Sequence, residues 1–381
     1  MSNEMHAAEN TALIQLIRER MRAEHTGMIT FRTYMEFCLY HPEYGYYMNS
    51  EPKVGLQGDF YTSSHIGTIM GEMLAHEIAK YWSLYGDLNN YQLIEWGGGT
   101  GRLAGQILDE LEKAYPDYYR MLNYVIIDKS AYHRGLQNQL SHHHTGKIKI
   151  YTPQDWGTFK LSERAVILSN ELLDAFPVHR LQYTQSQFHE IMVGWDEENG
   201  QFMESLRTLS PEDPLCELLH SHRVPDELKE GQLLELNPAI APWIRSASDA
   251  LHTGMLITID YGDLAEHLYA PNRMRGTYMC YYRHQGHDNP YLHVGRQDIT
   301  AHVNFDACIE AGVAAGLTDW TFRSQRQFLM QAGVLERLTA HQESDPFHPI
   351  VKRNRAIRSI LLGDGMGETF KVLIQKKGDP A

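Results

Sequence analysis

The 381-residue sequence contains few cysteines, and they form no pairing pattern. The four lie far apart without a CxxC spacing, at Cys38, Cys216, Cys280 and Cys308. Such dispersed cysteines are atypical of a disulfide framework and favour reduced thiols. The sequence also lacks any apolar stretch near the roughly 18 residues of a membrane span, and MSNEMHAAEN at the start has no basic or apolar region of the kind a secretory signal has. We therefore expect a soluble, cytoplasmic protein.

Positive charge is scarce as well. Lys and Arg number 34 against 48 Asp and Glu, which gives a formal net charge of −14, and no Lys/Arg-rich run of five or more residues occurs. Because neutralising phosphates requires a basic face, we expect no nucleic-acid partner. The hydrophobic share of 43% and the charged share of 22% are ordinary globular values and argue against disorder. The length predicts one large domain with insertions, or two domains.

Patterns of metal ligands are incomplete. His76-Glu77 begins like the zinc-protease motif HExxH, but Lys80 stands at the fifth position. The run His142-His143-His144 lies beside Ser141 and is most simply an exposed loop. We therefore expect no metal site.

Apolar periodicity predicts helices that alternate with strands. Amphipathic helices are expected at 10–24 and 66–85. Short apolar strands are expected at 91–96, 124–128, 147–151, 165–169, 255–260 and 370–374. Strands alternating with helices indicate an α/β fold with a mostly parallel sheet.

Two regions depart from this alternation. Residues 180–206 alternate apolar and polar positions around 196–200, which is typical of a hairpin or meander. Residues 262–310 are rich in His, Tyr, Arg and Asn and show little periodicity. A long loop-rich insertion is often a binding loop or lid, so we expect both regions to form a cap over the carboxyl edge of the sheet.

A glycine-rich turn follows the strand expected at 91–96. Gly97-Gly98-Gly99-Thr100-Gly101 precedes a helical pattern that begins at Arg102. Without Cβ atoms, backbone N–H groups approach a ligand closely, typically a nucleoside derivative. The dinucleotide pattern GxGxxG fails because its last position is Arg102, while the relaxed GxGxxA form is met by residues 99–104. The glycines alone leave the cofactor undecided.

Two acids accompany the turn. Glu95 stands two residues before Gly97, and the resulting ExGxGxG pattern resembles motif I of class I S-adenosylmethionine (SAM) methyltransferases. Asp128, at the end of the next strand, is placed to accept hydrogen bonds from two ribose hydroxyls. Together these residues favour SAM, although either acid alone could belong to an ordinary strand-to-helix turn.

Longer segments resemble one family, the MidA-type methyltransferases, whose mitochondrial relatives act as arginine methyltransferases in respiratory complex I assembly. In chain order the matching segments are FRTYME (31–36), HPEYGYY (41–47), GDFYTS (58–63), NELLDAFPV (170–178), IDYG (259–262), RGT (275–277) and DITAHVNF (298–305). Trp96 and the glycine triplet 97–99 depart from the family, which has a smaller apolar residue and a less glycine-rich turn there. Both changes are compatible with SAM, because the backbone path need not change.

The resemblance implies a Rossmann-like class I methyltransferase sheet with an N-terminal helical segment, inserted substrate-cap regions, and SAM as cofactor. It implies SAM contacts from Gly58, Asp59, Thr62, Ser63, Glu95, Gly97, Gly99, Gly101, Asp128, Asn170 and Glu171. It also suggests that Gln154, Asp155 and Trp156 lie near the adenine, where a capped turn is the alternative. The expected domains are an N-terminal helical segment that contributes to the cofactor site (1–85), a SAM-binding core (86–179), an inserted β-meander and helical region (180–254), and the remainder of the core with the cap insertion (255–381).

An arginine acceptor, which the resemblance implies, sets a chemical requirement. The guanidinium pKa lies above about 12, so carboxylates must orient the group and take up its proton after methyl transfer. Glu171 and Asp174 follow the fourth strand at the sheet edge where ligands bind, and they share a face if a helical turn begins there. Simple capping by Asn170 or Asp174 is the alternative. His302 could hold the guanidinium or move a proton, unless it is a structural histidine.

We therefore expect a SAM-dependent methyltransferase that acts on an accessible arginine of a protein partner. Two alternatives stay open: a nicotinamide-dependent oxidoreductase, and a SAM-binding assembly factor with little turnover.

Overall fold

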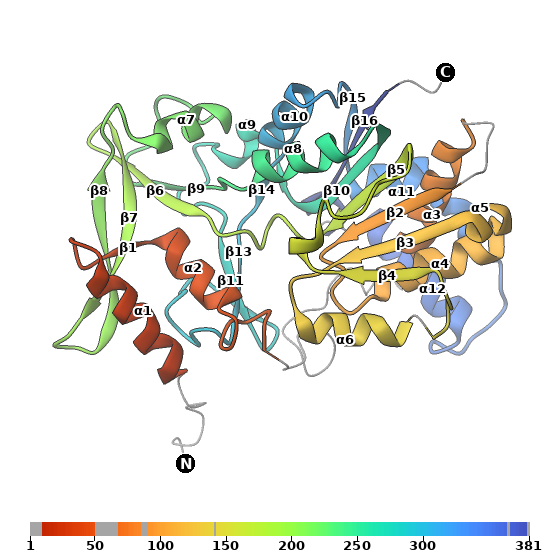
Figure 1. The fold of residues 1–381 in the computed structure, drawn as a ribbon, viewed down its shortest axis with the longest axis horizontal. Coiled ribbons are helices and arrows are strands. Elements are labelled where there is room, and N and C mark those ends of the chain that lie inside the picture. The colour runs from red at the N-terminus through yellow and green to blue at the C-terminus, as the bar shows by residue number, and fades with distance from the viewer. Residues whose placement is uncertain (1–9, 50–67, 85–89, 141, 364–365, 379–381) are drawn as a thin grey trace, which may run out of the picture. The chain divides into compact units, whose positions relative to one another are not determined.

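The computed structural model describes residues 10–49, 68–84, 90–140, 142–363 and 366–378 (Figure 1). By internal contacts the chain groups into two compact units. Unit 1 comprises residues 1–60, 173–242 and 263–310, and unit 2 comprises residues 61–172, 243–262 and 311–381. Both segments of the expected cap, 180–206 and 262–310, lie largely or wholly in unit 1.

Unit 2 is built on a mixed sheet whose strand order is β15-β16-β10-β5-β2-β3-β4. The strands are β2 (Tyr91–Trp96), β3 (Leu122–Ile127), β4 (Ile148–Tyr151), β5 (Arg164–Asn170), β10 (Thr253–Asp263), β15 (Asp319–Ser324) and β16 (Phe370–Lys377). Strands β4, β3, β2, β5 and β10 are parallel, and β16 is antiparallel to both of its neighbours. In chain order the parallel part runs 3-2-1-4-5, as in a Rossmann-like sheet. The expected α/β fold class is confirmed.

Helices accompany this sheet. They are α3 (Ile69–Trp82), α4 (Arg102–Ala114), α5 (Pro116–Met121), α6 (Ala131–Leu140), α11 (Gln325–Gln331), α12 (Pro349–Leu362) and α13 (Met366–Thr369), with short 3₁₀ turns η2 (Pro153–Asp155) and η3 (Val334–Arg337). Helices α8 (Ile240–Ala250) and α10 (Phe305–Ala314) begin in unit 1 and end in unit 2. Strand β2 is buried along Tyr91–Glu95, which explains its continuous apolar run. Trp82 of α3 packs on Tyr91 with ring centroids 4.8 Å apart, so that the helix bears directly on the strand that carries the glycine turn.

Buried ion pairs join the peripheral helices of unit 2 to this core. Arg353 of α12 makes two contacts with the carboxylate of Glu72 in α3, at 2.7 and 2.6 Å. Arg337 of η3 lies 2.8 Å from Glu110 of α4. Because both acids are buried, their cationic partners fix α12 and η3 on the α3–α4 pair.

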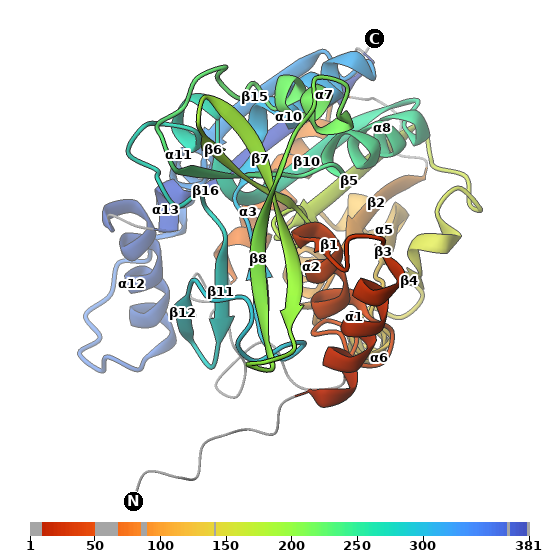
Figure 2. The same ribbon diagram turned by 90° about the vertical axis from the view of Figure 1, so that its left-hand side faces the viewer.

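Unit 1 contains an antiparallel sheet in the order β1-β7-β6-β9, with β8 also paired to β7. Its strands are β1 (Ile29–Thr30), β6 (His179–Thr184), β7 (Gln187–Asp196), β8 (Gln201–Thr208) and β9 (Gln232–Leu236). Figure 2 shows β7 and β8 as a long hairpin. The hairpin turns at Gly200, whose φ is +65°. Strands β6, β7 and β8 pair in succession, so the alternation at 180–206 predicted the meander correctly.

The remaining elements of unit 1 include a second small sheet in the order β12-β11-β13, to which β14 does not belong. They are α1 (Thr11–Ala23), α2 (Phe31–Tyr40), α7 (Pro214–Ser221), α9 (Ala265–Leu268), β11 (Met279–Tyr282), β12 (Gln285–His287), β13 (Asp298–Thr300) and β14 (Val303–Asn304). Tyr34 of α2, Val193 of β7 and Ile299 of β13 belong to one buried apolar cluster. The weakly periodic region 262–310 therefore contains short strands and packs through a few apolar side chains.

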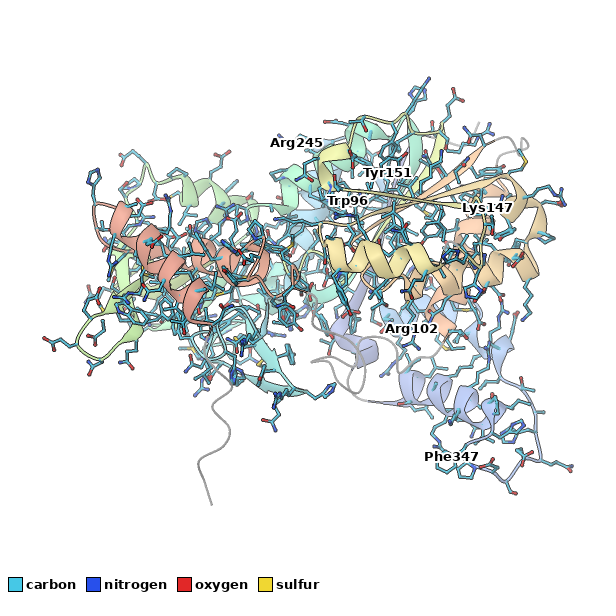
Figure 3. All side chains as sticks on the ribbon, turned by 60° about the horizontal axis from the view of Figure 1, so that its bottom comes forward. Trp96, Arg102, Lys147, Tyr151, Arg245 and Phe347 are labelled. Atoms are coloured by element: carbon cyan, nitrogen blue, oxygen red, sulfur yellow. The ribbon has the colours of Figure 1, made fainter. Side chains whose placement is uncertain are left out.

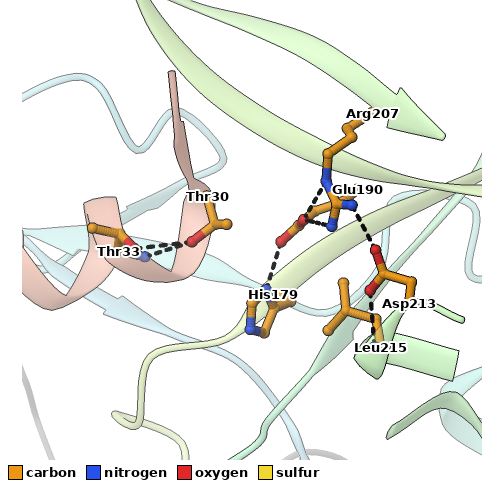
Figure 4. Close-up of polar contacts among 7 residues, drawn as sticks. All are labelled: Thr30, Thr33, His179, Glu190, Arg207, Asp213 and Leu215. Carbon is orange, nitrogen blue, oxygen red and sulfur yellow. Dashed lines mark hydrogen bonds and ion pairs between the residues drawn. The ribbon is translucent and has the colours of Figure 1, made fainter. Parts of the chain in front are cut away.

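A charged network ties the meander together (Figure 4). Buried Glu190 of β7 accepts a hydrogen bond from Nη2 of Arg207 in β8 at 2.5 Å and lies 2.6 Å from Nδ1 of His179 in β6. Arg207 also donates to Asp213, whose other oxygen accepts from the backbone N–H of Leu215. The network links three strands to the first turn of α7.

Candidate cofactor and acceptor sites

The glycine turn lies at the carboxyl end of β2, between the end of that strand at Trp96 and the start of α4 at Arg102. Strand β2 pairs with β3 on one side and β5 on the other, so the turn occupies the topological switch point of the sheet, where ligands bind in such folds. Gly99 has φ of +52°, and no atom of the described ranges lies within 4 Å of the place its Cβ would take. Among the described residues, the space above Gly99 is therefore open.

Below the turn the packing is close. A Cβ on Gly98 would stand 2.5 Å from Cγ2 of Ile126 and 3.6 Å from Oε2 of Glu95. The turn therefore rests on the ends of β2 and β3 and tolerates no larger residue at Gly98.

Glu95 lies beneath the turn. Its side chain is buried, and Oε2 accepts a hydrogen bond from the hydroxyl of Tyr124 at 2.9 Å. Burial raises the pKa of the Glu95 carboxyl from 4.5 to about 8; the hydrogen bond from Tyr124 opposes this shift, and the charge of Asp128 adds to it. Near neutral pH the carboxyl is mostly protonated. A direct contact between Glu95 and SAM stays a prediction.

The raised pKa of Glu95 has a consequence for stability. Between pH 4.5 and about 8 the folded chain retains a proton that the unfolded chain releases, so this group lowers the free energy of unfolding as pH rises through that window. We expect Glu95→Gln, which cannot ionise, to remove this part of the pH dependence and to be more stable relative to the wild type at about pH 8 than at about pH 5. Urea unfolding at both pH values measures the difference. An equal effect at both would contradict the raised pKa.

Asp128 follows β3 and is held by the turn itself. Its Oδ2 accepts from the backbone N–H of Gly99 at 3.0 Å and from Nε2 of Gln137 at 2.9 Å, and its Oδ1 accepts from the N–H of Ser130 at 2.9 Å. The carboxylate is buried, and it lies at the carboxyl ends of the strands, where a residue that accepts hydrogen bonds from the ribose is expected. The structure thus brings Asp128 and Gly99 together, while the ribose contact stays a prediction.

Aromatic side chains lie at and just beyond the carboxyl ends of β2 and β4. Trp96, Ile127 and Tyr151 are register partners across β2, β3 and β4, and Figure 3 shows Trp96 and Tyr151 at this end of the strands. Trp156 meets Trp96 edge to face at 5.2 Å and donates from Nε1 to Ser246 of α8. Trp156, the residue directly after η2, is therefore in contact with the tryptophan at the end of β2.

The residues predicted near the adenine have different surroundings. Asp155 accepts from both the backbone N–H and the hydroxyl of Thr152, at 2.8 and 2.7 Å, and these bonds lower its pKa. This is the capped turn that the sequence left open as an alternative. Gln154 is exposed, and contact of Gln154, Asp155 or Trp156 with adenine stays a prediction.

Asn170 and Glu171 close strand β5. Glu171 takes a left-handed φ of +51°, which is uncommon for a residue with a side chain and is often found at functional sites. Its backbone N–H donates to Ile259, and its Oε1 accepts from Nδ2 of Asn170 at 3.2 Å. Residues 171–178 form no helix, so a shared helical face does not bring Glu171 and Asp174 together. Glu171 belongs to unit 2 and Asp174 to unit 1.

Asp174 lies in a group of acids and tyrosines within unit 1, which we call the acidic-aromatic cluster: Asp174, Asp298, Tyr40, Tyr47 and Tyr281. The hydroxyl of Tyr47 donates to Oδ1 of Asp298 at 2.8 Å, and Tyr40 stacks on Tyr47 at 5.6 Å. Loss of hydration and then the charges of Asp298, Tyr40 and Asp174 raise the pKa of Tyr47. The pKa of Tyr281 is raised by burial and then by Asp298 and Asp174. Two carboxylates therefore lie near the same tyrosines.

The backbone just before His302 is hydrogen-bonded to this cluster. The N–H of the preceding Ala301 donates to the carbonyl of Asp174 at 3.0 Å, and the N–H of His302 donates to the hydroxyl of Thr277 at 3.1 Å. Thr277 in turn donates to buried Glu235, whose pKa is raised chiefly by burial. The structure thus places Asp174 against Ala301, the residue before His302, but the role of His302 stays a prediction.

Some predicted cofactor contacts lie outside the described residues, and other residues of the candidate sites were not predicted from the sequence. Gly58, Asp59, Thr62 and Ser63 belong to the first group. Among the missed residues are Tyr47 and Asp298, which the family resemblance covered without giving them a role. Gln137 was missed too, because a glutamine in a polar helix carries no sequence signal of burial.

The sheet order and the glycine turn at the switch point define a Rossmann-like methyltransferase fold. Over residues 73–322 the chain matches the model of a family described as "Putative S-adenosyl-L-methionine-dependent methyltransferase", and it belongs to this family. The protein is therefore a SAM-dependent methyltransferase, as the sequence predicted, and the nicotinamide alternative is set aside.

Solved and curated relatives agree with this assignment. A protein from Burkholderia thailandensis, crystallised with S-adenosyl-homocysteine, is 30% identical with a TM-score of 0.82, and the match covers 96% of this chain and 92% of that one. The mitochondrial protein arginine methyltransferase NDUFAF7 of Xenopus tropicalis is 26% identical over 97% of this chain and 87% of its own length. The human protein of the same name is 27% identical over 78% of this chain and 68% of its own length.

The expectation of a cytoplasmic location is wrong in the light of these relatives. The curated relatives are named as mitochondrial proteins, and this finding overturns the cytoplasmic expectation. Dispersed cysteines and the lack of an apolar run did not identify the compartment. In the described ranges, no helix is long and apolar enough to cross a membrane.

Proposed function

We propose that this methyltransferase transfers the methyl group of SAM to an arginine side chain of a partner protein. The observation that carries the proposal is the activity in the relatives' names: protein arginine methyltransferases that match up to 97% of this chain. No acceptor is identified by the cofactor site itself, so the acceptor is argued from the relatives and from unit 1.

For the cofactor, we assign the ribose hydroxyls to Asp128 and the methionine portion to the turn Gly97–Gly101. The open space above Gly99 supports close approach of a ligand to the backbone. Glu95, Asn170 and Glu171 would complete the described part of the site, whereas Gly58, Asp59, Thr62 and Ser63, which the resemblance implies as contacts, lie outside the described residues. Trp156 would stand beside the adenine.

For the acceptor, the acidic-aromatic cluster has suitable chemistry. A guanidinium is planar, permanently charged and able to donate five hydrogen bonds, so paired carboxylates and aromatic rings suit it. Asp174 and Asp298 supply charge, and Tyr40 and Tyr47 supply ring faces. Asp174 would orient one nitrogen of the guanidinium for in-line displacement, and a carboxylate or His302 would accept the proton released; Glu171, in unit 2, is a separate catalytic candidate.

The test is methylation with isotopically labelled SAM. The full chain is incubated with a nuclease-treated lysate, and modified residues are identified by mass spectrometry. Label on protein arginine supports the proposal, whereas label confined to lysine or to small metabolites contradicts it. Binding of SAM without any incorporation would instead favour the assembly-factor alternative. Equal labelling in treated and untreated lysate would agree with the expected lack of a nucleic-acid partner.

A further inference from the structure

Helix α6 buries an unusual face. A helix on a sheet normally buries an apolar stripe, but the buried residues of α6 are His133 and Gln137, four positions apart on one face. Gln137 is fully buried. Nδ1 of His133 lies 3.8 Å from Oδ2 of Asp128. The two buried side chains of this helix are therefore polar and lie beside Asp128, while Leu140 at its end packs partly buried against the apolar core.

The amide of Gln137 bridges two parts of the candidate cofactor site. Nε2 donates to the carbonyl of Gly99 at 2.8 Å and to Oδ2 of Asp128 at 2.9 Å. The opposite amide orientation would place the carbonyl oxygen against these two acceptors, so only this orientation is favourable. Both hydrogens of the NH₂ group are thereby used on the turn and on its acid.

The other end of the same amide is unsatisfied. Oε1 of Gln137 is buried and has no hydrogen-bond partner among the described residues. A buried acceptor without a partner costs stability, so a glutamine chosen for stability alone would not be expected here. The role of Gln137 is instead to hold the carbonyl of Gly99 and the carboxylate of Asp128 through its NH₂ group.

We infer that Gln137 is a positioning residue for SAM. It locks the Asp128 carboxylate against the Gly99 backbone, so that the remaining lone pair of Asp128 Oδ1 stays directed at the ribose and the turn keeps its ligand-binding conformation. The inference rests on the proposed cofactor contact of Asp128. Loss of the amide therefore raises the KM for SAM while kcat changes little, because Gln137 acts through cofactor binding.

The decisive variant is Gln137→Glu. As a carboxylate it repels Asp128 and has no hydrogen to donate, whereas in its protonated form it donates one hydrogen bond again. At about pH 8.5 we expect affinity for S-adenosyl-homocysteine to fall by at least roughly tenfold, the effect of losing one hydrogen bond to a charged group. Towards about pH 5.5 the affinity recovers relative to the wild type, because the crowded carboxyl takes up a proton.

Calorimetry on the full chain across this pH range provides the measurement, and initial rates provide KM and kcat. Gln139→Glu is the matched control, since it makes the same change at an exposed position of α6 and should bind like the wild type. Gln137→Met, which lacks donors but nearly preserves shape, should bind weakly at every pH and decides the matter if the glutamate variant does not fold. Wild-type affinity in both Gln137 variants, or a loss that does not depend on pH in Gln137→Glu, would overturn the inference. Failure of the wild type to bind S-adenosyl-homocysteine would instead refute the proposed cofactor site.

Discussion

Gly99→Val is expected to abolish measurable binding of SAM and S-adenosyl-homocysteine. Two effects act together. A β-branched residue at a φ of +52° is strained by about 1 to 3 kcal/mol, and the strain pulls the backbone N–H and carbonyl of residue 99 away from Asp128 and Gln137. In addition, the isopropyl group would fill the space above the turn, where no described atom now lies within 4 Å of the Cβ position. We expect affinity to fall by more than about a hundredfold, which corresponds to roughly 3 kcal/mol.

A matched control is available on the neighbouring helix. Gly135 of α6 also has no described atom within 4 Å of its Cβ position, but its φ is not positive and it is exposed. Gly135→Val should therefore leave cofactor affinity unchanged. Calorimetric titration of both variants, with circular dichroism to verify folding, separates the two sites. Near-normal affinity in Gly99→Val would show that the ligand does not approach this turn.

The sheet was predictable because its signals are local. Strands β2, β3, β5 and β10 are mostly buried and so carry short apolar runs, and β2 was expected at the residues where it lies, 91–96. The glycine turn and Asp128 were also accessible, since both adjoin strand ends within 40 residues of each other in the sequence. Positions next to the ends of parallel strands converge on one edge, which made the cofactor site a reasonable prediction before any coordinates.

The other site residues depend on contacts that sequence periodicity does not report. Gln137 is a polar residue on a helix whose buried face is polar, and such a face has the pattern of an exposed one. Asp298 meets Tyr47 across 251 positions, through the pairing of β11 with β13 and the packing of α2 beside it. The shared helix expected for Glu171 and Asp174 failed for a local reason: Glu171 takes a left-handed conformation directly after β5, and this conformation does not continue into a helix.

Asp174→Asn is expected to lower the rate of methyl transfer by roughly two to four orders of magnitude, the range for loss of a positioned acid or base. The substitution keeps the shape of the side chain but removes its negative charge from the acidic-aromatic cluster, where Asp298 would be the only remaining carboxylate. A guanidinium acceptor would then be less well oriented and its proton less readily accepted. Affinity for S-adenosyl-homocysteine should change little. Glu171→Gln should lower the rate similarly, although as a candidate cofactor contact it should also weaken SAM binding.

The double variant shows whether the two carboxylates act on the same step. If they jointly orient one guanidinium, Glu171→Gln combined with Asp174→Asn should be little slower than the slower single variant, because groups that act as a unit are not additive. Asp226→Asn, at an exposed position of unit 1, is the matched control and should retain full activity. Single-turnover rates with saturating SAM and an identified arginine substrate provide the comparison. Full activity of Asp174→Asn would remove the acidic-aromatic cluster from the acceptor site, and multiplicative losses in the double variant would assign Glu171 and Asp174 to independent steps.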